Sequence, residues 1–171
     1  MKKILLLVII STSLTPYFGH AAGDASSSVT FNAVSVTGGT NMSAKPKVTS
    51  ESTLPAAKIK VKDLVVGNGG AADPTSTVVV QYVGVRYSDG KQFDSSWERG
   101  GPKSFSLKRV VKGFTEGIGG DENDQIKAMR VGGRRIIIVP SEMGYGESGT
   151  PDRSVPPNET LVFVVDLVAV K

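Results

Sequence analysis

The stretch from Val78 to Arg99 constrains the fold more than any other part of the chain. It opens with three consecutive valines and continues through a mixture of β-branched and aromatic residues to Tyr87. Residues of these types favour a pleated, half-buried strand. The Ser-Asp-Gly turn at 88–90 then reverses the chain, because Gly tolerates positive φ and Asp tolerates the left-handed region. The sequence therefore predicts a hairpin that delivers Phe93 and Asp94 side by side.

Several kinds of chemistry are excluded by residues that the chain lacks. It contains no cysteine, and its single histidine is His20, near the N-terminus. If that region is removed, Ser-His-Asp and Cys-His mechanisms and most zinc sites are excluded. We therefore expect an activity that needs neither a metal nor a cofactor.

The balance of charge gives no sign of a nucleic-acid or membrane partner. The formal charge of +4 includes Lys2 and Lys3; without them, 18 basic residues face 16 acidic ones, and the charge is +2. So small an excess does not predict binding to polyanions. The basic pairs Lys108-Arg109 and Arg134-Arg135 are interpreted as solvated strand ends.

The N-terminal segment predicts export. Met1–Gly23 has a charged start, a short apolar core and small residues at its end, which is typical of a cleaved secretory signal peptide. The apolar core is far shorter than the ~20 residues needed to span a bilayer, which disfavours the alternative of an uncleaved anchor. We expect a periplasmic or secreted protein without a membrane anchor.

The next segment, residues 24–55, predicts a disordered linker. It is rich in Ser, Thr, Gly, Asn and Ala and has no sustained helical period. A weak alternation from Ser28 to Val34 leaves open one short strand.

Residues 56–171 predict one β-rich domain with a single short helix. Apolar residues at intervals of three and four mark the helix, and alternating or β-branched runs mark the strands. Beyond the hairpin, the predicted elements are strands at 59–66, 105–107, 134–139 and 160–170 and a helix at 110–118. The last strand is apolar on both faces, except at Asp166, which predicts a broadly buried central strand.

Three local motifs resemble known binding or modification sites but lack the context that would support such a function. Gly144–Gly149 has the letters of a dinucleotide-binding loop, but prolines block the helix that should follow. The acidic loop Asp121–Asp124 lacks the spacing of a calcium loop. Asn158-Glu-Thr160 fits a glycan acceptor pattern that is common by chance.

The aromatic residues and one carboxylate point to a pocket. For Phe105 and Phe163, a place in the core and a place in the pocket wall are equally open interpretations. Tyr145 differs, because it lies in a Gly-Tyr-Gly loop and its hydroxyl needs a partner. Asp94 either closes a local turn toward Ser96 or pairs with Arg99 beside the aromatic rings.

The segment from Val79 to Val170 resembles the FKBP family of peptidyl-prolyl cis–trans isomerases, the immunophilins that bind rapamycin. The matching pieces are VVVQYVG, SDGKQFDSS, VVKGFTEGI, MRVGGRRIIIVPSEMGYGESG and VPPNETLVFVVDLV. The resemblance implies an α+β fold, in which a strongly bent antiparallel sheet of about five strands wraps around one short helix.

The resemblance also implies a binding pocket and a division of roles within it. Asp94, Tyr145 and the backbone of Val111 would act in catalysis, and Arg99 would support Asp94. The residues implied to bind substrate are Tyr82, Phe93, Val110, Phe114, Val155 and Phe163. The chain departs from the common family pattern at Phe114, where Trp is usual, at Lys103, where Phe is frequent, and at polar Ser154.

The activity that the resemblance implies is rotation about Xaa-Pro bonds in exported polypeptides, without a covalent intermediate. The implied ligands are proline-containing polypeptides and a rapamycin-type macrolide, and we expect a monomer. The alternative is a weakly catalytic peptide-binding module or folding chaperone on the same fold.

Overall fold

The computed structural model describes residues 27–52 and 54–171. The predicted signal peptide, Met1–Gly23, lies outside the described residues. Within the described part of the chain, no helix is both long and apolar enough to cross a membrane.

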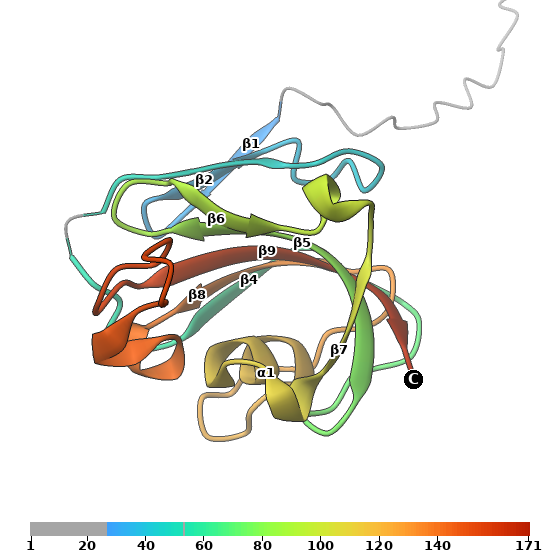
Figure 1. Ribbon diagram of the computed structural model, residues 1–171. Helices are drawn as coiled ribbons and strands as arrows, with labels where there is room; N and C mark the ends of the chain where they lie inside the picture. Colours follow the sequence, from blue (N-terminus) through green and yellow to red (C-terminus); the bar gives the residue numbers. More distant parts are fainter. Residues whose placement is uncertain (1–26, 53) are drawn as a thin grey trace, which may run out of the picture.

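The main sheet is antiparallel and strongly bent (Figure 1). Its strand order is β4-β8-β9-β5-β6, and β7 also pairs with β5. The strands are β4 (Lys60–Val65), β5 (Thr77–Arg86), β6 (Gln92–Ser95), β7 (Lys103–Ser106), β8 (Arg134–Val139) and β9 (Leu161–Val170). This arrangement confirms the expected sheet of about five strands and the hairpin that carries Phe93 and Asp94.

The one α-helix among the described residues, α1 (Lys112–Gly119), packs against the concave side of the sheet (Figure 1). Two helical glycines permit the close approach: a Cβ on Gly113 would lie 2.2 Å from Val139, and one on Gly117 would lie 2.6 Å from Ile137. Glycine lowers the intrinsic helix propensity, so packing against β8 must stabilise the helix. It begins two residues later than predicted, because Val110 and Val111 remain extended.

The described residues also include four short 3₁₀ helices in the connections between strands and α1. They are η1 (Trp97–Arg99), η2 (Leu107–Arg109), η3 (Ser141–Met143) and η4 (Gly146–Ser148). The long loop that precedes β9 therefore has local structure of its own, and it carries Tyr145 between η3 and η4.

A second, three-stranded antiparallel sheet precedes the main domain: β1 (Ser28–Phe31), β2 (Val34–Thr37) and β3 (Lys47–Ser50). We call residues 28–50 the N-terminal layer. The layer covers the face of the main sheet opposite to α1 (Figure 1). The prediction of a disordered linker over residues 24–55 is therefore wrong for these strands, while the short strand left open near residue 28 is confirmed.

The layer is ordered because it buries apolar surface on both sides of the contact. Val34 and Val36 are fully buried against the back face of the main sheet. That back face is lined by Val83, Val85, Tyr87, Ile136, Ile138, Val162 and Val164. Burial of apolar surface offsets the entropy lost on ordering the chain, and it confirms that β9 is buried on both faces.

The interpretation of Arg134 and Arg135 as solvated strand ends is wrong, because both side chains are buried. Arg134 pairs with Asp166 on β9, and Arg135 pairs with Asp63 on β4. Buried charges require such partners. These partners lie on other strands, so local sequence gave no indication of them.

Candidate functional site

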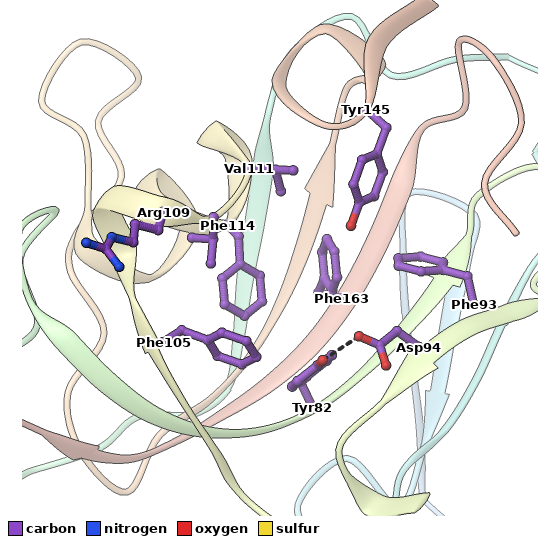
Figure 2. Close-up of a pocket in the computed structure, with 10 residues that line it drawn as sticks. Tyr82, Phe93, Asp94, Phe105, Arg109, Val111, Phe114, Tyr145 and Phe163 are labelled. Carbon is purple, nitrogen blue, oxygen red and sulfur yellow. Dashed lines mark hydrogen bonds between the residues drawn. The ribbon is translucent and has the colours of Figure 1, made fainter. Parts of the chain in front are cut away.

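A cavity of about 260 Å³ opens between α1, the bent sheet and the loop that carries Tyr145 (Figure 2). Most of its wall is aromatic or aliphatic, with one carboxylate. The lining residues are Tyr82, Phe93, Asp94, Phe105, Arg109, Val110, Val111, Phe114, Tyr145 and Phe163. The structure thus brings together eight of the nine residues that the sequence placed in the pocket, the exception being Val155.

The apolar wall is a cluster of edge-to-face rings. Phe163 lies at its centre, with ring centroids 5.1 Å from Phe114 and 5.6 Å from Phe93. Tyr82 closes the deep side, 6.0 Å from Phe114 and 5.9 Å from Phe105. Packing of this kind holds each ring in a fixed orientation, so the pocket has a preformed apolar surface.

A polar cluster lies at one edge of these rings. The hydroxyl of Tyr82 donates a hydrogen bond to the Asp94 carboxylate at 2.5 Å. Arg99 donates to the same hydroxyl, and its Nη1 lies 3.3 Å from Asp94 Oδ1. Asp94 also accepts the N–H of Ser95. The predicted pairing of Arg99 with Asp94 is confirmed, and it holds the carboxylate in one orientation at the rim.

Apart from the exposed Arg109 guanidinium, the pocket offers two further hydrogen-bond donors that have no acceptor among the described residues. One is the N–H of Val111, which immediately precedes α1 in extended backbone. The other is the hydroxyl of Tyr145, which points into the pocket (Figure 2). Tyr145 is 39% exposed, so a bound molecule can reach it. The pocket therefore combines an apolar floor with two donors that can bond carbonyl oxygens.

Burial and neighbouring charge keep both pocket tyrosines protonated. Burial is the main cause that raises the pKa of Tyr82, followed by its hydrogen bond to Asp94. Burial also raises the pKa of Tyr145, and the negative charges of Asp94 and Asp152 add to this effect. Both hydroxyl groups consequently remain hydrogen-bond donors throughout the neutral pH range.

Val155 does not line the cavity. It is only 1% exposed and packs within the apolar core. Its N–H donates to Thr150 Oγ1, and the neighbouring Ser154 hydroxyl donates to Asp152. The structure therefore does not place Val155 in the cavity wall, where it was expected. The residue anchors the loop from inside.

The sequence interpretation did not assign Arg109 to the pocket and left Phe105 undecided. Phe105 lies on β7, whose register with β5 places it opposite Val78, and its ring meets Tyr82. Arg109 was grouped with Lys108 as a solvated pair. Its position directly before the two pocket valines, Val110 and Val111, was the signal that could have identified it.

Only one group of potential metal ligands occurs in the described part of the chain. Carboxylate oxygens of Glu116, Asp121 and Asp124 lie within 4.8 Å of one another. They are not among the residues that line the cavity, and Glu116 already pairs with Lys112 at 3.4 Å. This arrangement has no part in the pocket described above.

A family model and the similar proteins found by sequence all point to one family. A family model described as FKBP-type peptidyl-prolyl cis-trans isomerase matches residues 69–168. The FK506-binding protein of Streptomyces anulatus is 42% identical over 128 residues, which cover 74% of this chain and 97% of that protein. The FKBP-type peptidyl-prolyl cis-trans isomerase FkpA of Escherichia coli strain K12 is 44% identical over 105 residues, or 61% of this chain and 35% of that protein.

Solved structures agree with these relatives. AtFKBP13 superposes with a TM-score of 0.62 at 32% identity, covering 70% of this chain and 98% of that chain. FkpA from Escherichia coli superposes with a TM-score of 0.58 at 37% identity, covering 72% of this chain and 51% of that chain. The N-terminal layer, residues 28–50, lies outside the segment that the family model matches.

Proposed function

Because this chain belongs to the FKBP-type peptidyl-prolyl cis-trans isomerase family, we propose that its aromatic pocket binds the proline ring and catalyses rotation about the preceding peptide bond. The observation that carries this proposal is the combination of a preformed apolar pocket with two unpartnered donors, the Val111 N–H and the Tyr145 hydroxyl.

The reaction needs no nucleophile. Rotation about an Xaa-Pro bond faces a barrier of roughly 20 kcal/mol, because twisting removes amide resonance. The planar amide is charge-separated, whereas the twisted amide is less polar. An apolar surface made by Phe93, Phe114 and Phe163 therefore favours the twisted form relative to water.

The polar groups of the pocket hold the substrate while its peptide bond rotates. The Val111 N–H and the Tyr145 hydroxyl bond substrate carbonyls on either side of the rotating bond and hold the flanking peptide while it turns. Asp94, oriented by Tyr82 and Arg99, contributes a local field at the rim. A rate gain of about 10⁶ requires only ~8 kcal/mol of preferential binding to the transition state.

The decisive experiment measures cis–trans exchange of an Xaa-Pro tetrapeptide with the purified mature protein. We expect acceleration by the wild type and a moderately lower kcat/KM for Asp94→Ala, with thermal unfolding showing that the variant remains folded. Equal kcat/KM in the two proteins would contradict the role given to Asp94. Tight peptide binding without acceleration would instead favour the chaperone reading.

The family binds FK506- and rapamycin-type macrolides as well as proline-containing polypeptides. For this chain we infer macrolide binding in the same pocket, action as a monomer, and export to the periplasm or medium. The charged, apolar and small-residue sequence of Met1–Gly23 supports export. N-terminal sequencing of the native protein should find the mature chain near Ala22–Asp24, and retention of Met1 would contradict export.

A further inference from the structure

Arg109 is a cation at the pocket rim that has no role in the isomerase mechanism proposed above. It ends η2, directly before Val110 and Val111, and it belongs to the lining of the cavity. The residue is exposed, and its guanidinium points away from the aromatic rings (Figure 2). It is therefore placed to meet the chain that flanks a bound proline.

The guanidinium of Arg109 has no carboxylate partner within residues 27–52 and 54–171, and it makes no hydrogen bond there. The neighbouring cations differ in this respect. Arg99 pairs with Asp94, Lys112 pairs with Glu116, and Lys103 donates to the carbonyl oxygen of Arg99. Arg109 is the cation that lines the cavity, and its charge is available to a ligand, whereas that of Arg99 is neutralised by Asp94.

The loop that carries Tyr145 also carries a carboxylate, Asp152. Asp152 acts on Tyr145 electrostatically, as the raised pKa of that tyrosine records. Asp152 accepts hydrogen bonds from Ser154 but has no cationic partner in the described part of the chain.

We propose that Arg109 determines specificity by favouring substrates with an acidic side chain next to the proline. This inference rests on the proposed isomerase function, and it names the substrate class of the same site. A flanking Glu or Asp beside Arg109 forms an ion pair at the rim, whereas a flanking Lys meets an unneutralised cation. Isolated exposed pairs of this kind change an equilibrium by about two- to five-fold, which sets the preference expected.

The test compares kcat/KM for matched tetrapeptides that carry Glu, Gln or Lys, first immediately before and then immediately after the proline. The wild type should prefer Glu over Gln by about two- to five-fold at one of these positions, and Lys should be the poorest substrate. Salt at about 1 M, where the screening length is ~3 Å, should remove the preference.

Charge reversal makes the assignment specific to Arg109. Arg109→Gln should bring the Glu:Gln ratio close to one, and Arg109→Glu should invert the order so that the Lys peptide is favoured. Lys108→Gln is the matched control: Lys108 is adjacent, exposed and not part of the cavity lining. That variant should keep the wild-type ratio.

The outcomes separate this inference from the isomerase function itself. If the Gln peptide is accelerated but no Glu preference appears, or if the preference survives in Arg109→Gln, the specificity role is overturned while the isomerase function stands. If none of the peptides is accelerated, both are overturned. An equal loss of preference in Lys108→Gln would assign the effect to general surface charge and also overturn the role of Arg109.

Discussion

Arg134 on β8 and Asp166 on β9 form an ion pair from which water is almost excluded: the side chains are 0% and 7% exposed. Nη2 of Arg134 lies 2.7 Å from Asp166 Oδ2. The same guanidinium also donates to the carbonyl oxygens of Gly38, Asn41 and Ala44, at 3.2, 3.0 and 3.3 Å. One side chain therefore joins two strands of the main sheet to the N-terminal layer.

Arg134→Met should destabilise the protein strongly, because it leaves the Asp166 carboxylate buried without a counter-charge. Removing one partner of a buried pair typically costs about 3–5 kcal/mol. The double variant Arg134→Met, Asp166→Leu should lose less, since no unpaired charge remains. Urea unfolding of the three proteins measures the difference, and a single variant as stable as the wild type would refute the coupling described here.

The N-terminal layer should resist proteolysis together with the main domain. Val34 and Val36 are fully buried, and burial of two valines is worth ~3–6 kcal/mol. A variant that begins at Ala56 should therefore unfold at lower urea concentration and bind more of a dye specific for exposed apolar surface. Brief digestion followed by mass spectrometry checks the intact protein: rapid cleavage within residues 28–50 would contradict the docked layer.

Tyr145→Phe should lower kcat/KM several-fold and leave stability unchanged. The substitution removes one donor aimed into the pocket, and a hydrogen bond of this kind is worth ~0.5–1.5 kcal/mol. No hydrogen bond within the described protein is lost, because the hydroxyl has no partner there. Tetrapeptide exchange and thermal unfolding are the two measurements, and unchanged kcat/KM would remove Tyr145 from the mechanism.

The raised pKa values of the pocket tyrosines predict how the stability of the folded protein changes at alkaline pH. Burial raises the pKa of both Tyr82 and Tyr145 above the usual value of about 10. The folded state thus holds these protons more tightly than the unfolded chain. Their contribution to stability is complete below about pH 10 and is lost as pH rises through the raised values.

Absorbance at the phenolate band, measured on the wild type and on Tyr82→Phe, tests this ordering. The wild type should show one tyrosine that ionises well after the others, and Tyr82→Phe should lack that late step. The free energy of unfolding should fall less steeply above pH 10 in the variant. Ionisation of every described tyrosine near pH 10 would contradict the buried Tyr82–Asp94 contact.

Much of the main domain could be predicted from sequence because its signals are local. The hairpin after Val78 has its turn residues within the same stretch, and the helix at α1 has its apolar face within nine residues. The aromatic residues and Asp94 indicated a pocket, and the resemblance to the FKBP family supplied its individual residues. Phe163 is the partial exception, since only the fold shows that its ring is shared between core and cavity.

The N-terminal layer could not be predicted in the same way, because its stability is not local. Its strands are short and rich in Ser and Thr, and their few apolar residues are buried only by the distant back face. One signal was present: Val162 and Val164 make a second apolar face on β9 that a single sheet around one helix leaves uncovered. Likewise, the burial of Arg134 depends on Asp166, 32 residues away.

The way in which the N-terminal layer docks has a consequence for how the chain reaches its native state. The layer is synthesised before every strand that it covers, and its hydrogen bonds join residues 93 and 96 positions apart, from Arg134 to Asn41 and to Gly38. Contacts of such long range slow folding. Until β9 is in place the valine-rich back face stays open to other chains, so the protein is vulnerable to aggregation late in its own folding.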